Sequence, residues 1–172
     1  MKPKEKEYAE FYARYVKLAP ETSIAQALAQ SEESIVSIFN SLTEDQGNFA
    51  YAEGKWNLKE MLVHLMDSER IFSYRALRIA RNDLTPLAGF EQDDYVPFSN
   101  SSERRLSDLI EEYKIVRLST KSLFNSFTSE MLERKGIASN SPISCRALAY
   151  IISGHELHHK SVIEERYLIN AN

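Results

Sequence analysis

Four long stretches of the chain repeat apolar residues at a spacing of three and four, and this pattern constrains the fold more than any other feature of the sequence. The stretches are residues 24–42, 57–80, 101–128 and 144–169. Side chains three and four apart share one face of an α-helix, so each stretch predicts an amphipathic helix. With only five glycines and five prolines in 172 residues, little interrupts them. We therefore predict an all-α protein, an up-and-down-type four-helix bundle.

The segments before and between these helices differ in length and composition. Residues 5–18 mix aromatic and charged side chains at helical spacing and stop before Pro20, which predicts a short N-terminal helical arm across the bundle. Residues 82–100 form a long connection between helices 2 and 3 that permits a crossover, and 129–143 form another connection with one helical turn. We expect no sheet and a single domain over residues 1–172.

Charge and cysteine content indicate which partners and compartment to expect. The formal charge of −4 at pH 7 opposes binding to a phosphate backbone, so we expect no nucleic-acid partner. Arg70, Arg75, Arg78 and Arg81 recur at helical spacing, but acidic residues between them indicate a solvated or ion-paired face. The single cysteine, Cys145, cannot form an intramolecular disulfide. The charged N-terminus and the lack of a long apolar run predict a cytoplasmic protein without a membrane span.

All four histidines lie in two of the predicted helices. His155 and His159 are one helical turn apart, in places of an apolar stripe where Leu or Ile would be expected. His64 lies at the edge of the stripe of the second helix. Three imidazole nitrogens suit zinc, nickel, copper or iron and leave positions open for water or substrate. We predict that these three hold one metal ion and that His158, which points about 100° away from His159, stays at the rim.

Two other interpretations of the 155–159 segment stay open. Without a metal, His155 and His159 would be hydrogen-bonded core or interface residues, because an unsatisfied buried imidazole is costly. The segment also matches the His-Glu-x-x-His pattern of zincin metallopeptidases, in which Glu156 would be the general base. No Gly-x-x-His follows and no strand-rich domain is expected, so a metallopeptidase is the minor alternative.

Several segments together resemble the DinB-like superfamily, which includes YfiT-like proteins proposed as metal-dependent hydrolases. The resemblance extends from about Tyr8 to Leu168, and the residues that carry it are Lys55–Leu65 with Asp67, Glu69 and Arg70, Pro86–Phe90 with Asp93–Tyr95, Arg146–Tyr150, and Gly154–His159 with Glu165–Leu168. It implies a four-helix bundle that holds a divalent metal, often nickel or zinc, through His64, His155 and His159. It also implies thiol-dependent transferases and isomerases that use low-molecular-weight thiols such as bacillithiol or mycothiol, and a homodimer.

The sequence thus predicts a metal-dependent enzyme with a small-molecule substrate. A bound metal would lower the pKa of a water molecule or thiol for attack on an electrophile, in hydrolysis or thiol transfer. Asp67 and Glu156 are the candidate catalytic acids, placed to orient the imidazoles. The candidates for the substrate pocket are Trp56, Phe90, Tyr95 and His158. The alternative is a non-catalytic metal-binding or dimerisation module.

Overall fold

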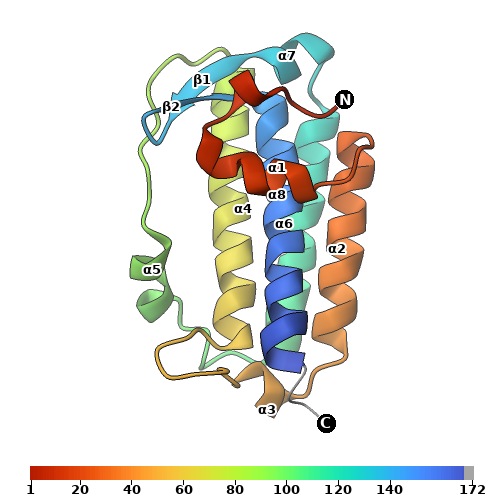
Figure 1. Cartoon of the computed structure of the whole chain (residues 1–172), viewed down its shortest axis with the longest axis vertical. Helices are drawn as coiled ribbons and strands as arrows, with labels where there is room; N and C mark the ends of the chain where they lie inside the picture. The colour runs from red at the N-terminus through yellow and green to blue at the C-terminus, as the bar shows by residue number, and fades with distance from the viewer. Residues whose placement is uncertain (169–172) are drawn as a thin grey trace.

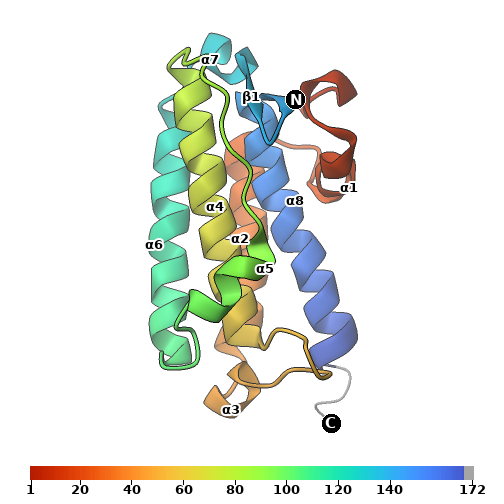
Figure 2. The same ribbon diagram turned by 90° about the vertical axis from the view of Figure 1, so that its left-hand side faces the viewer.

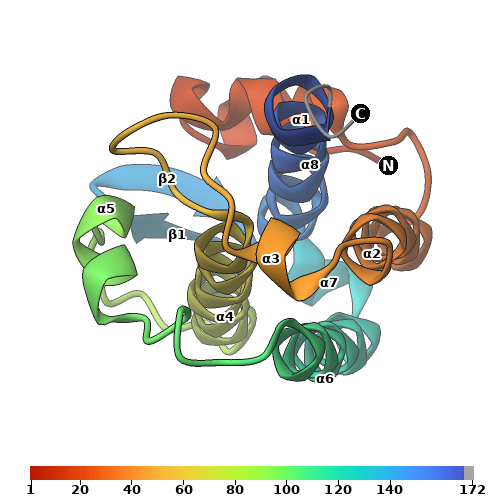
Figure 3. The ribbon, with the colours of Figure 1, turned by 90° about the horizontal axis from the view of Figure 1, so that it is seen from below.

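Four long helices form the body of the molecule (Figure 1), and the computed structural model describes residues 1–168. The helices are α2 (Ile24–Asn40), α4 (Leu58–Ala80), α6 (Leu106–Asn125) and α8 (Cys145–Ile163). Around the bundle they contact one another in the order α2, α8, α4, α6, so α2 and α4 lie at opposite corners (Figure 3). The predicted four-helix bundle is confirmed.

The helix directions differ from a simple up-and-down arrangement. α2 and α8 run away from the end that holds the N-terminus, whereas α4 and α6 both run towards it (Figure 1). These two helices share a direction because the connection between them returns along the length of the bundle (Figure 2). That connection carries α5 (Gln92–Tyr95) and a 3-10 turn (Val96–Phe98). The long segment between helices 2 and 3 is therefore a crossover.

Side-chain caps begin the two helices that carry the histidines. Asn57 Oδ1 accepts a hydrogen bond from the Glu60 amide at 2.8 Å, and Glu60 Oε2 accepts one from the Asn57 amide at 2.7 Å. This capping box satisfies two backbone donors that α4 would otherwise leave free. Ser144 Oγ accepts from the Ala147 amide at 3.1 Å and caps α8 in the same way. Local sequence therefore determines where the histidines fall along both helices.

Two large apolar clusters fill the interior, one towards each end of the bundle, and a third, small cluster contains Ala19, Ala27 and Tyr150. On α4, for example, Phe72, Ala76 and Ile79 belong to one cluster, and Met61 and Leu65 belong to the other. The residues of all four helices between these clusters include buried polar and charged side chains, which are Ser31, Ser68, Glu69, Arg117, Thr120, Ser153, His155 and Glu156. The bundle thus has a polar middle layer.

A two-stranded antiparallel hairpin precedes α8, so the prediction of no sheet is wrong. It follows α7 (Ser129–Glu133), which is the predicted helical turn, and consists of β1 (Lys135–Ala138) and β2 (Ser141–Ser144). Ser139 and Asn140 form its two-residue turn with φ of 51° and 61°. Tight hairpin turns favour Asn-Gly or Asp-Gly at these positions. A Ser-Asn turn between strands of four residues carries too weak a pattern to predict.

α6 begins at Leu106, later than the predicted start within residues 101–103. The Glu44 carboxylate, from the single-turn helix α3 (Glu44–Gly47), accepts a hydrogen bond from the Leu106 amide at 2.9 Å. A residue distant in sequence therefore satisfies this helix start, which explains why local capping signals misplaced it.

The N-terminal arm crosses α8, as predicted (Figure 1). It consists of 3-10 turns at Glu5–Glu7 and Glu10–Tyr12 followed by α1 (Ala13–Leu18). Its backbone packs directly on Gly154, where an added Cβ would lie 1.8 Å from the Tyr15 carbonyl oxygen. The arm therefore depends on a residue without a side chain in the middle of α8.

The last described segment is a π-helical turn at Glu164–Leu168, which continues α8. Ile169, which we assign to the apolar stripe of the last helix, lies outside the described residues. Within residues 1–168, no helix combines the length and the apolar character needed to cross a membrane.

Candidate metal centre

The three predicted ligands come from two adjacent helices, α4 and α8. His64 lies in the first half of α4, and His155 and His159 lie one turn apart on α8. His64 is 5% exposed and His155 is 6% exposed, while His159 is half-buried. The fold therefore brings His64 to the His155 and His159 pair across 91 residues of sequence, as the sequence predicts.

The Nε2 atoms of the three rings converge. His155 Nε2 lies 3.0 Å from His64 Nε2 and 3.0 Å from His159 Nε2, and ligand atoms of all three lie within 4.8 Å of one another. Two imidazole nitrogens that bind one zinc ion at about 2.1 Å are about 3.0 to 3.4 Å apart. The spacing of these nitrogens therefore fits a shared metal ion. Within residues 1–168, this is the one such cluster of His, Cys, Asp or Glu.

Burial keeps the three imidazoles neutral at pH 7. It lowers the pKa of His64 to about 4. Burial, and then the neighbouring imidazoles, lower the pKa values of His155 and His159 well below the usual range. A neutral imidazole has a free lone pair, which is the form that binds metals. Protonation state and geometry both suit a metal site.

The predicted pocket residues surround this cluster. The Trp56 ring centroid lies 4.8 Å from that of His64, and Trp56 shares an opening of about 420 Å³ with His159. Phe90 and Tyr95, whose ring centroids are 5.6 Å apart, line a small cleft beside His64. These aromatic side chains belong to the loop before α4 and to the crossover, so irregular segments form the rim.

His158 lies beneath the arm and outside the cluster of converging nitrogens. Its ring centroid is 5.6 Å from that of Tyr15 and 5.1 Å from that of His159. Adjacent residues point about 100° apart on a helix, which is why His158 and His159 face different surroundings.

The two candidate acids have different environments. Asp67, one turn after His64, lines the small cleft, where burial raises its pKa although Arg70 lies nearby. Glu156 is 2% exposed. Its Oε1 accepts a hydrogen bond from the Tyr113 hydroxyl at 2.5 Å and forms a salt bridge with Arg117 Nη2 at 2.6 Å. The expectation that Glu156 orients the imidazoles is corrected, because it points into a different part of the polar layer.

This placement also weighs against a zincin-type peptidase. In that mechanism the Glu of His-Glu-x-x-His is the general base beside the metal, and a base must lie within hydrogen-bond reach of the proton it takes. Glu156 is instead engaged with a buried guanidinium and a phenol. The placement of Glu156 therefore does not support a zincin mechanism, despite the sequence match.

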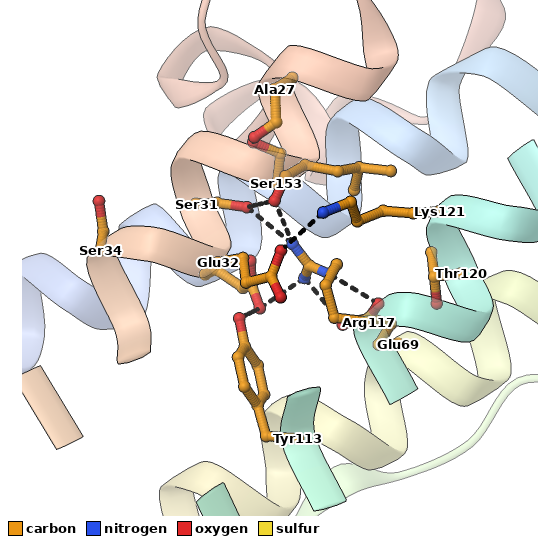
Figure 4. Close-up of polar contacts among 12 residues, drawn as sticks. Ala27, Ser31, Glu32, Ser34, Glu69, Tyr113, Arg117, Thr120, Lys121 and Ser153 are labelled. Carbon is orange, nitrogen blue, oxygen red and sulfur yellow. Dashed lines mark hydrogen bonds and ion pairs between the residues drawn. The ribbon is translucent and has the colours of Figure 1, made fainter. Parts of the chain in front are cut away.

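A buried ion network, which the sequence did not predict, occupies the rest of the polar layer (Figure 4). Arg117 donates to both carboxylate oxygens of Glu69 at 2.9 and 2.8 Å, and to the Leu28 carbonyl and Ser31 Oγ at 2.7 and 3.0 Å. Because Arg117 also pairs with Glu156 of α8, its guanidinium links all four long helices. Its signal in the sequence is the position of Arg117, within the apolar stripe of α6.

A cavity of about 460 Å³ opens beside the histidines, with His155 in its wall. Arg14 and Tyr15 of the arm and Ser68 and Phe72 of α4 also line it. The aromatic residues of the arm are expected from the sequence to pack on the core. Tyr15 is buried as expected, but its ring also lies 5.2 Å from that of His155. The arm therefore forms part of the site.

The prediction that the arginines of α4 form a solvated or ion-paired face is wrong for Arg75. Arg70 and Arg78 do pair with carboxylates, but Arg75 is 1% exposed. Its Nη2 donates to the Ala88 carbonyl at 2.8 Å and to Ser139 Oγ at 3.0 Å, while Nη1 has no partner among the described residues. Its place in the apolar stripe, three residues after Phe72, is the signal that indicates burial.

The chain matches a known protein family and a named bacterial relative. The family model of the DinB superfamily matches residues 27–163. A protein of Oceanobacillus iheyensis, named "Putative metal-dependent hydrolase", is 26% identical over 131 residues, which cover 73% of this chain and 72% of the relative.

Two solved structures from Bacillus subtilis share the fold. YfiT, described as "a probable metal-dependent hydrolase with an unusual four-helix bundle topology", matches with a TM-score of 0.75 at 16% identity, over 96% of this chain and 90% of YfiT. The DinB-like protein YjoA matches with a TM-score of 0.61 at 19% identity, over 88% of this chain and 93% of YjoA.

Proposed function

Because the chain belongs to the DinB superfamily, we propose that it is a metal-dependent enzyme in which His64, His155 and His159 hold one divalent ion. The observation that carries this proposal is the 3.0 Å spacing of the converging Nε2 atoms, in rings that burial keeps neutral. The names of the Oceanobacillus iheyensis protein and of YfiT support a metal-dependent enzyme. Nickel or zinc is the ion we propose, because both accept imidazole ligands and the family resemblance implies one of them.

A divalent ion at this position would supply Lewis-acid chemistry and lower the pKa of water or of a thiol. The chain supplies the surroundings. Tyr15 and Phe72 form an apolar wall beside His155, which limits water and strengthens electrostatic interactions there. Asp67, whose pKa burial raises, is the carboxyl placed to take up or release a proton at Oδ1 or Oδ2 near His64.

Hydrolysis is the reaction type that the relatives' names support. Transfer involving a low-molecular-weight thiol is the second type, which the family resemblance suggests. Both reactions need a nucleophile that is activated beside a small substrate, so the same site serves either one. A homodimer also stays a prediction, which sedimentation equilibrium of the purified protein tests directly.

The first experiment measures metal content. Protein purified without an affinity tag or chelator, then analysed by inductively coupled plasma mass spectrometry, should contain about one nickel or zinc ion per chain. Single His64→Ala, His155→Ala and His159→Ala variants should lose this metal, because each removes one of three ligands. His158→Ala is the matched control and should keep it. Wild-type protein without metal, or a triple variant that retains it, contradicts the site.

The second experiment distinguishes the reaction classes. The metal-loaded protein is screened with esters and amides for hydrolysis, and with low-molecular-weight thiols plus electrophiles for thiol transfer. We expect turnover in one set, and its loss in the His64→Ala variant. Bound metal without turnover in either set favours a non-catalytic metal-binding module over an enzyme. Peptide cleavage that Glu156→Gln abolishes would restore the metallopeptidase alternative.

A further inference from the structure

Two arginines without a carboxylate partner lie at the cavity over His155. Arg14 lines the cavity, and Arg75 is buried directly behind its wall, in contact with the lining residues Phe72, Phe90 and Ser139. Most arginines of the chain form salt bridges with Asp or Glu, namely Arg70, Arg78, Arg104, Arg105, Arg117, Arg134 and Arg146. Arg14, Arg75, Arg81 and Arg166 form no salt bridge with a carboxylate of residues 1–168, and of these four Arg14 and Arg75 lie at the cavity. Two cations without counter-charges at one cavity indicate that a ligand supplies the negative charge.

Arg75 is the buried member of this pair. Hydrogen bonds from Nη2 to Ala88 and Ser139 hold its guanidinium in place, while Nη1 stays without a partner among the described residues. The guanidinium carbon lies 5.8 Å from the Phe72 ring centroid and 5.7 Å from that of Phe90, and both rings line the cavity. A buried guanidinium with a free donor is costly unless something completes its hydrogen bonding.

Arg14 is the accessible member and lines the cavity itself. Its guanidinium lies over the Tyr15 ring at 4.6 Å from the centroid, and Nη2 donates to the Tyr15 hydroxyl at 2.6 Å. These contacts orient the guanidinium but use few of its five N–H donors. The remaining donors are available to a bound molecule.

The rest of the cavity suits a small organic anion. Ser68, Ser139 and Ser141 contribute hydroxyl groups, and aromatic rings form much of the wall. The acidic residue of the lining, Glu91, is exposed and belongs to the crossover. The mixture of apolar surface and a few convergent polar groups is typical of small-molecule sites.

We propose that this cavity binds a carboxylate-bearing small molecule, with Arg14 and Arg75 holding the carboxylate and the aromatic wall holding its apolar body. A guanidinium presents parallel donors that match a planar carboxylate, and the aromatic wall suits the apolar body of an organic acid. Arg75 is buried and the half-buried Phe90 ring of the crossover lies beside its guanidinium, so direct binding at Arg75 Nη1 requires that the Phe90 ring moves. The proposal deepens the proposed function, because it names the substrate class of the same site.

Binding measurements with small aromatic acids and their amides test this proposal. Phenylacetate and 3-phenylpropionate, each paired with its neutral amide, are titrated into metal-free protein by isothermal calorimetry or NMR. Each acid should bind at least tenfold more tightly than its amide. Arg14→Gln and Arg75→Gln should each weaken acid binding at least tenfold and leave amide binding within twofold. Arg81→Gln is the matched control, since Arg81 also lacks a salt bridge but lies over Phe127, which is not part of the cavity wall.

The outcomes separate this proposal from the metal site. If acid binding depends on both arginines but the protein holds no metal, the proposed function fails and the carboxylate site stands. Equal binding of acids and amides, or of wild type and variants, overturns the carboxylate site whatever the metal content. Tighter binding of phenyl phosphate than of either acid, or no binding of any probe to folded protein, also overturns it. If Arg75→Gln does not fold, the Arg14→Gln result decides.

Discussion

At the scale of single residues, the three converging histidines differ from ordinary surface histidines in their protonation. Burial holds the pKa of His64 at about 4, compared with 6.5 for the free side chain. His64 is therefore harder to protonate in the folded chain than in the unfolded chain. This difference links the stability of the fold to pH.

We predict that metal-free protein loses stability as the pH falls from about 6.5 to about 4. In that window the unfolded chain binds a proton at His64 that the folded chain does not bind, so the free energy of unfolding decreases as pH falls. The contribution of His64 alone is about 3 kcal/mol. Urea unfolding at several pH values should show a shallower pH dependence for His64→Gln. Identical slopes for variant and wild type would refute this assignment.

The buried ion network around Arg117 should contribute measurably to the stability of the fold. Arg117→Met should destabilise the protein by about 3 to 5 kcal/mol, because it leaves the Glu69 and Glu156 carboxylates buried without their cation. Arg105→Met is the matched control. Its side chain is 77% exposed and pairs with Asp108, so its loss should cost at most about 1 kcal/mol. Urea unfolding of both variants measures the contrast, and equal losses would contradict it.

At the scale of elements, the position of the arm relative to α8 decides whether the cavity exists. Two contacts hold the arm. Glu7 accepts hydrogen bonds from Arg146 Nε at 2.7 Å and Ser144 Oγ at 2.9 Å. Burial alone would raise the pKa of Glu7, but these hydrogen bonds and that of the Lys4 amide lower it to about 2. The second contact is the close packing of α1 on Gly154.

We predict that Gly154→Ala displaces the arm, although Ala favours a helix over Gly by about 1 kcal/mol. The added Cβ would overlap the Tyr15 carbonyl, which is backbone and cannot rotate away. The expected result is lower thermal stability and weaker binding of acids in the cavity, because Arg14 and Tyr15 move with α1. Ser161→Ala on the same helix is the control and should change stability by less than about 0.5 kcal/mol. A Gly154→Ala protein more stable than wild type, with unchanged binding, would refute this role of the arm.

At the scale of the whole molecule, a metal ion that joins α4 to α8 should stabilise the bundle. A ligand that binds only the folded state adds about 4 kcal/mol when its free concentration is 1,000 times Kd. We therefore predict that a chelator lowers Tm and that added nickel or zinc restores it. The His64→Ala, His155→Ala, His159→Ala triple variant should show neither shift. A chelator effect that persists in this variant would place the metal elsewhere.

The sequence by itself determined the helices and the histidine pair on α8. Residues three and four apart share a helix face, and the Asn57 and Ser144 caps are local, so pattern and spacing are sufficient evidence. His64, at the edge of the apolar stripe of the second long helix, was the one further histidine distant in sequence and so completed the predicted ligand set. Arg75 and Arg117 stand within apolar stripes, but the sequence analysis did not predict that they are buried or which partners they meet.

Only the tertiary structure decided how the crossover, the arm and the hairpin are placed. Glu44 caps α6 from a distant segment, Glu156 pairs with Arg117 rather than facing the imidazoles, and the arm brings Arg14 to the cavity. The physical reason is that these contacts join residues far apart in sequence. Their partners depend on helix order and direction, which local periodicity does not encode.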